Sequence, residues 1–159
     1  MSQEEPLFRS VSSEVDAHNR AMSIPITEVV RELVDLLGAT TVAVIGGVGE
    51  TRAVQRWMTD REPQRPHVLR FALQVGMTIA SSADREIARA WFHGSNPALS
   101  DQSPMLVLRN QPLHDVQAAV LAAARAFSRR VGPGASHPQS RDESAAGGPL
   151  EPRTRDGVG

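Results

Sequence analysis

The sequence predicts an all-α protein, and three observations support this fold class. Apolar residues recur at spacings of three and four between residues 26 and 131, which is the period of amphipathic helices. Helix start and stop signals, with Ser or Pro before a segment and Gly after it, separate these segments. The chain after Glu50 has helical rather than strand periodicity. We expect a helix-turn-helix-like unit over residues 25–81, packed on a three-helix module over residues 82–131.

Both ends of the chain are predicted to be disordered tails. Residues 1–24 are polar and acidic and carry no convincing helical stripe. Residues 132–159 are rich in Gly, Pro and Ser with scattered charge, so they cannot bury enough apolar surface to fold.

The composition excludes several classes of protein. At 159 residues the chain suits one domain, or one domain with tails, and its formal charge of −1 does not indicate a nucleic-acid or membrane partner. The absence of cysteine excludes disulfides and cysteine metal sites. No apolar run approaches the roughly 20 residues of a membrane span, and the N-terminus lacks the apolar core of a signal peptide. These features predict a cytoplasmic protein.

The first predicted helix spans residues 26–37 and ends at Gly38. Its apolar residues fall on one face at helical spacing, and charged residues occupy the other face. The apolar positions are Val29, Val30, Leu33, Leu36 and Leu37.

Residues 40–52 allow two interpretations. The run from Thr41 to Gly49 resembles a buried strand followed by a glycine loop, as at the start of a dinucleotide-binding unit. However, Arg52 stands where the third glycine belongs, and the chain has no lysine for a phosphate-binding loop. No later strand could complete a parallel sheet. The sequence therefore predicts no nucleotide cofactor and no enzyme.

The preferred interpretation is a pair of short helices. Thr40 or Thr41 would cap the first helix, Gly46 and Gly47 would lie inside it, and Gly49 would make the turn. The second helix would span residues 50–60. Glycine inside a helix costs roughly 1 kcal/mol relative to alanine, which weakens this layout.

The second helix of the pair would present a polar face. Val54, Trp57 and Met58 would point inward, while Arg52, Gln55 and Arg56 would point outward. In a helix-turn-helix, arginines at such positions contact phosphates or guanine edges, and glutamine contacts an adenine edge. The alternative is a solvated helix face without DNA. The spacing of the pair is also about one residue shorter than that of a standard helix-turn-helix.

The remaining segments are predicted to be helices separated by explicit turns. Residues 61–66 form a linker, and residues 67–80 form a helix that is apolar on most sides and therefore central. Ser82 would cap the next helix, and Gly94 would end it in a left-handed turn. Asn96 and Pro97 make a turn, and Ser103 followed by Pro104 starts a short helix. The last helix spans residues 112–131, with Leu113, Val116, Val120, Phe127 and Val131 on one stripe.

Four motifs follow one another in residues 82–131. They are Ala-x-Ala-Trp-Phe, Asn-Pro-Ala-Leu, Ser-Pro-Met-x-x-Leu and an Asp-Val in the last helix. The matching residues are Ala88, Ala90, Trp91, Phe92, Asn96, Pro97, Ala98, Leu99, Ser103, Pro104, Leu108, Asp115 and Val116. In this order and spacing they resemble the C-terminal toxin-binding domain of the Xre/MbcA/ParS antitoxins. Where that family commonly has glycines after Asn-Pro-Ala-Leu, this chain has Ser100-Asp101-Gln102, and Gln111-Pro112 replaces a frequent Gly-Glu.

The resemblance implies the antitoxin of a type II toxin–antitoxin system. The usual partner is a RES-domain toxin that consumes NAD, and the antitoxin inhibits it by occluding its active site. The implied toxin-binding residues are Trp91, Phe92, Asn96, Pro97, Leu99, Pro104, Leu108, Asp115, Arg129 and Arg130. Such antitoxins carry an Xre-like helical domain that often ends in Arg-Trp, and Arg56-Trp57 matches this. A homodimer is compatible with this class, although the sequence fixes no interface for it.

The aromatic pair in this module has two alternative placements. Trp91 and Phe92 are adjacent, so they point about 100° apart on a helix. Both could lie in the core, or one could be the apolar anchor that meets a toxin. These alternatives stay open.

Metal-binding and catalytic arrangements are not indicated. None of the histidines pairs with another His, Asp or Glu at metal spacing on one helix face, and no Ser-His-Asp set is supported by helix geometry. Inhibition by binding requires no catalytic residue in this chain.

Overall fold

The structure, a computed structural model, describes residues 6–132, and this part of the chain is all-helical. The all-α prediction is therefore confirmed, and residues 6–132 contain no β-strand. The elements are α1 (Pro6–Ser23), α2 (Ile26–Leu37), α3 (Ala39–Ile45), α4 (Thr51–Trp57), α5 (Pro66–Ser82), α6 (Arg85–His93), the 3-10 turn η1 (Pro97–Leu99), α7 (Pro104–Asn110) and α8 (Leu113–Val131).

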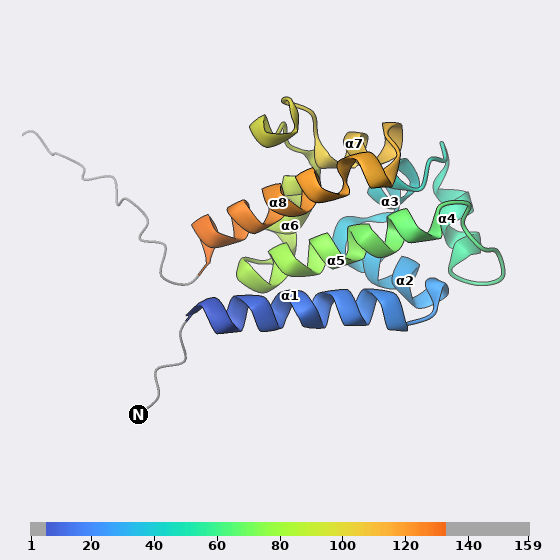
Figure 1. Cartoon of the computed structure of the whole chain (residues 1–159). Helices are drawn as coiled ribbons and strands as arrows, with labels where there is room; N and C mark the ends of the chain where they lie inside the picture. The colour runs from blue at the N-terminus through green and yellow to red at the C-terminus, as the bar shows by residue number, and fades with distance from the viewer. Residues whose placement is uncertain (1–5, 133–159) are drawn as a thin grey trace, which may run out of the picture.

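Helix α5 is the centre of the molecule, as its apolar circumference predicts. It lies between α1 and α8 (Figure 1), and it also contacts α2 and α6. Gly76 of α5 lies where two helices meet it closely. A Cβ atom built there would be 2.7 Å from Leu36 Cδ2 and 3.7 Å from Phe92 Cε2. The missing side chain lets α2 and α6 approach α5, so one apolar core runs through both predicted units.

The N-terminal segment corrects a prediction. Residues 1–24 were expected to be a disordered tail, but residues 6–23 form α1, which packs along α5. Over residues 12–23, its buried residues are Ala17 and Ala21, and Arg70 of α5 donates hydrogen bonds to the carbonyls of Ala21 (2.9 Å) and Ile24 (2.8 Å). Alanines give a weak periodic signal, which is why the sequence pattern missed this helix. Residues 1–5, and all but Gly132 of the predicted C-terminal tail, lie outside the described residues.

The segment with two interpretations is a helix and not a strand. α3 covers residues 39–45, so the nucleotide-loop alternative, which requires a β-strand before the glycines, is wrong. Two details of the preferred layout were wrong. Gly38, and neither Thr40 nor Thr41, occupies the N-cap position. Gly46 and Gly47 end α3 and do not lie inside it, and Gly47 makes the turn with φ +82°.

The α5–α6 junction also differs from prediction. Ser82 was expected to cap the second helix, but it is the last residue of α5 and donates a hydrogen bond to the carbonyl of Thr78. Asp84 caps α6 instead, because its Oδ1 accepts the Ile87 amide hydrogen at 2.8 Å. Gly94 ends α6 in an extended conformation and not in a left-handed turn.

The last two helices follow the predicted signals closely. Ser103 caps α7 by accepting the Leu106 amide hydrogen, and Pro104 is the first helical residue. Pro112 immediately precedes α8. On the predicted stripe of α8, Val116 and Val120 are buried, whereas Val131 is 37% exposed because it lies at the free end of the helix.

Candidate functional site

The aromatic pair of α6 lies in the core. Trp91 is 8% exposed and Phe92 is fully buried. Their ring centroids are 5.2 Å apart at an interplanar angle of 84°, an edge-to-face arrangement that aromatic rings favour. The structure thus resolves the open alternative: both side chains belong to the core, and neither forms an exposed apolar anchor.

Three more of the predicted toxin-binding residues are also interior. Leu99 is 7% exposed, Leu108 is 1% exposed, and Pro104 is buried at the start of α7. These residues pack η1, α6 and α7 together with α8. In the isolated chain they determine the shape of the module and do not form its outer surface.

The Asn96–Gln102 loop carries the exposed part of the motif. Asn96 is half-buried, and its Oδ1 accepts the Ala98 amide hydrogen at 3.0 Å, while Pro97 is exposed. Ser100 and Asp101 follow with φ values of +56° and +61°. This left-handed conformation is unusual for residues other than glycine, so the backbone of this loop has one defined, costly shape.

The remaining predicted residues lie exposed along α8. Asp115 is in the first turn, where a carboxylate suits the helix dipole, and its Oδ1 is 3.2 Å from His114 Nε2. Arg129 and Arg130 are exposed in the last turn, where cations suit the dipole. The two ends of α8 therefore present opposite charges, separated by the length of the helix.

Two exposed apolar residues of this module were missed at the sequence level. Ile87 on α6 is 38% exposed and Leu106 on α7 is 42% exposed. No sequence signal indicated the exposure of Ile87, because it stands four residues before Trp91, a spacing that places both residues on one helix face. A single exposed Leu or Ile needs no functional explanation, but both lie beside the motif residues in sequence.

The face of α4 has the predicted orientation. Val54 and Trp57 are buried, and Arg52, Gln55 and Arg56 are exposed together on the opposite side. The surrounding charges are balanced. Exposed carboxylates at residues 50, 60 and 62 equal in number the exposed arginines at residues 52, 56 and 61. Such a face offers side chains for base contacts but little net attraction for phosphate.

Other kinds of site are poorly represented in the described chain. Within residues 6–132, no three His, Cys, Asp or Glu side chains gather closely enough to hold a metal ion. Over the same residues, no helix combines the length and apolarity that crossing a membrane requires. Two shallow hollows beside α1 have volumes of about 390 and 490 Å³. Neither contains a residue from the motifs of α6 to α8.

Comparisons with known proteins leave the chain without an assigned family. No family model matches the sequence, and no curated protein or solved structure is significantly similar to it.

Proposed function

We propose that this protein is an antitoxin that binds a RES-domain, NAD-consuming toxin through residues 84–131. The observation that supports this proposal best is the fit between the antitoxin-like motifs and one structural module. Trp91 and Phe92 lie in its core, Asn96 caps η1, Ser103 caps α7, and Asp115 lies in the first turn of α8. Each motif thus has a defined role in the same set of packed elements.

A departure from the antitoxin pattern supports the same proposal. The family commonly has glycines after Asn-Pro-Ala-Leu, and this chain has Ser100 and Asp101 there. Both residues have positive φ, which glycine adopts without steric cost. The chain therefore has the backbone conformation that such glycines favour, despite its different side chains.

In this proposal the toxin contacts the exposed rim above the buried motif residues. The contact surface consists of Asn96 and Pro97 in the loop, Ile87 on α6, and the exposed ends of α8. Trp91 and Phe92 act from below by fixing the loop and helix positions. Protein interfaces of this kind combine a few apolar anchors with a polar rim. Arg129 and Arg130 at the end of α8 would help to occlude the toxin's active site, and the setting would be the cytoplasm.

The test is co-expression of the full chain with the product of each adjacent gene. We expect one neighbour alone to deplete cellular NAD and stop growth, and this chain to co-purify with it and restore both. If no neighbour depletes NAD and none co-purifies, the antitoxin proposal fails.

A matched pair of double variants sharpens this test. Arg129→Glu with Arg130→Glu changes the end of α8, and Arg52→Glu with Arg56→Glu makes the same charge change on α4. The α8 double variant should reduce co-purification and NAD protection, while the α4 double variant should leave both unchanged. Equal losses from the two pairs would indicate a general effect of charge and contradict a specific role for α8.

A second function, binding of operator DNA, is supported by the face of α4. Arg52, Gln55 and Arg56 are exposed on one side of α4, the second of two short helices joined by a turn. A gel shift with the DNA upstream of the gene should show a complex that weakens with salt and disappears in the Arg52→Ala, Arg56→Ala variant. Absence of any shift at low salt would exclude this function.

A further inference from the structure

Residues 12–23 of α1 are attached by small side chains. From Ser12 onward, its buried hydrophobic residues are Ala17 and Ala21 alone. The shorter helix α2 buries five large aliphatic side chains: Val29, Val30, Leu33, Leu36 and Leu37. An alanine contributes one methyl group to a core, so residues 12–23 gain little from the hydrophobic effect.

The face of α5 that α1 covers is polar. Arg70, Gln74, Thr78 and Ser81 recur at spacings of four, four and three, which places them on one side of the helix. Two of these side chains already have partners within α5. Thr78 donates to the carbonyl of Gln74 at 2.9 Å, and Ser81 donates to the carbonyl of Thr78 at 2.9 Å. If α1 moved away, these polar side chains would meet water, together with Met77, which lies on the same side of α5 and lines a hollow with Ala17.

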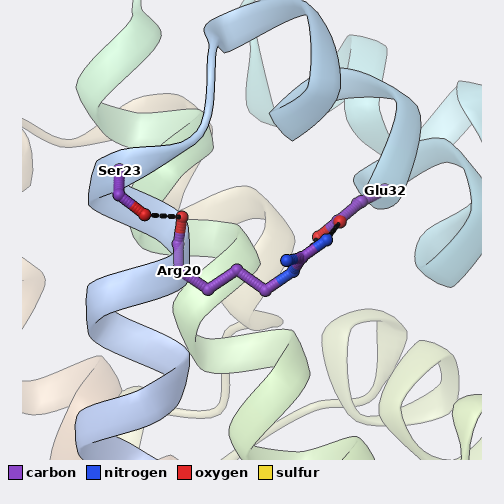
Figure 2. Close-up of polar contacts among 3 residues, drawn as sticks. All are labelled: Arg20, Ser23 and Glu32. Carbon is purple, nitrogen blue, oxygen red and sulfur yellow. Dashed lines mark hydrogen bonds and ion pairs between the residues drawn. The ribbon is translucent and has the colours of Figure 1, made fainter.

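The polar contacts between α1 and its neighbours are also easily replaced by water. Ser13 donates to Ser81 at 2.9 Å, and His18 Nδ1 lies 3.2 Å from Gln74 Oε1. Arg20 pairs with Glu32 of α2 (Figure 2), a hydrogen-bonded pair that raises the pKa of Arg20 above its usual value. Arg125 of α8 donates to Glu14 of α1 at 2.9 Å, and the exposed fractions of these two side chains are 48% and 22%. Ion pairs that water reaches contribute little to stability, so they do not lock the helix in place.

Between residues 12 and 23, the larger apolar side chains of α1 lie on its outward face. Val15 is 51% exposed and Met22 is 45% exposed, and their spacing of seven residues places them on one side. Ala17 and Ala21 lie on the opposite side, toward α5. The amphipathic pattern of the described part of α1 is thus reversed relative to its packing, which a permanently docked helix would not favour.

We infer that α1 is a detachable strap, which leaves α5 while residues 25–132 keep their fold. Arg70 ties the C-terminal end of α1 by donating to the carbonyls of Ala21 and Ile24. This tie places the hinge of the movement at Ile24 and Pro25, between α1 and α2. Arg20 of α1 lines both hollows on this side, so undocking removes one wall of each.

Hydrogen exchange of the full chain, followed by mass spectrometry, tests this inference. We expect amides of residues 13–23 to exchange on the order of 100-fold faster than those at the centre of α5, because local opening requires less free energy than global unfolding. Ala17→Glu, which places a carboxylate in the α1–α5 contact, should accelerate exchange in α1 by about 10-fold more. Exchange at the centre of α5 should stay unchanged.

The matched control is Val15→Glu, two residues away on the exposed face of α1. It introduces the same side chain into the same helix but should leave exchange in α1 close to that of the original chain. Similar exchange rates for α1 and α5, or acceleration of both by Ala17→Glu, would show that α1 is part of the cooperative core and overturn the inference. Equal acceleration of exchange by the two variants would indicate an effect of the added negative charge on α1 and not of the α1–α5 contact, and would also overturn the inference.

Discussion

Arg65 and Arg109 join the two halves of the chain through main-chain carbonyls. Arg65 Nη1 donates to the carbonyl of Arg109 at 3.2 Å. Arg109 Nη1 in turn donates to the carbonyls of Val44 (3.1 Å) and Val48 (3.3 Å). These carbonyls lie at or near the C-terminal ends of α3 and α7, where the last carbonyls have no partner within the helix. The two guanidinium groups donate to carbonyls at these helix ends, and their charge suits the negative ends of both helix dipoles. The carbonyl of Val44 also accepts the Gly47 amide hydrogen at 3.1 Å.

Replacement of Arg65 is expected to destabilise the fold. Its guanidinium also donates to the carbonyls of Ile45 (3.2 Å) and Leu108 (2.9 Å), so Arg65→Ala leaves three half-buried acceptors without this donor. Because water can reach part of this site, we expect a loss of about 2–3 kcal/mol in the free energy of unfolding, measured in urea. Arg65→Lys should recover less than half of it, since an ammonium group cannot span three carbonyls.

The control for this change is Arg61→Ala, an exposed arginine in the same linker. It should alter the free energy of unfolding by less than about 0.5 kcal/mol. A similar loss from both variants would mean that the linker's charge, and not the carbonyl contacts of Arg65, sets the stability.

Gly46 is expected to tolerate no side chain, unlike its neighbour Gly49. A Cβ atom at Gly46 would lie 2.6 Å from Cη2 and 2.7 Å from Cζ3 of Trp57, which is buried and rigid. Gly46→Ala should therefore destabilise the protein by about 1–3 kcal/mol.

At Gly49 a Cβ atom would meet nothing within 4 Å, and φ is not positive. Gly49→Ala should be neutral or stabilising by up to about 1 kcal/mol, because it restricts the unfolded chain. Thermal unfolding of the two variants measures the difference. Equal melting temperatures would show that Trp57 can move aside.

Capping of α6 provides a third prediction. Asp84 Oδ1 accepts the Ile87 amide hydrogen, so Asp84→Ala should cost about 1 kcal/mol, measured by urea unfolding. Ser82→Ala, at the position that the sequence had suggested as the cap, should cost less than about 0.5 kcal/mol. A larger loss from Ser82→Ala than from Asp84→Ala would show that Ser82 is the cap of α6.

Local signals predicted the fold well where a segment carries its own helix pattern. The stripe of α2 and the Ser103 cap of α7 were correct because each depends on residues within a few positions. Prediction failed where tertiary contacts decide. Over residues 12–23, α1 buries only two alanines against α5, and Gly46 ends α3 where Trp57 leaves no room for a Cβ atom.

The candidate site was predicted less well than the fold. The period of α6 shows that Trp91 and Phe92 point in different directions, but it cannot show how many sides of the helix are covered. Here α2, α5 and α7 all contact α6, so both rings are buried. The exposed face falls to Ile87, which the pattern had grouped with the interior residues.

This burial leads to a prediction that separates folding from binding within α6. Phe92 is fully buried, so Phe92→Ala should destabilise the protein by about 3–5 kcal/mol and reduce toxin binding only as far as it unfolds the module. Ile87 is 38% exposed, so Ile87→Ala should change the free energy of unfolding by less than about 1 kcal/mol. If Ile87 lies at the proposed interface, its truncation should weaken the complex by about 5- to 30-fold, as expected for 1–2 kcal/mol lost at an apolar contact.

Measurement of stability and of partner affinity on the same samples separates the folding role of Phe92 from the binding role of Ile87. Urea unfolding gives the free energy of unfolding of each variant. Titration with the purified partner, without urea, gives the affinity, and circular dichroism gives the concentration of folded protein in that titration. Leu106→Ala, on the neighbouring helix α7 and 42% exposed, tests whether the contact extends beyond α6. Unchanged affinity in Ile87→Ala and Leu106→Ala would show that these two apolar side chains lie outside the proposed interface. The loop and the ends of α8 would then be its remaining contacts.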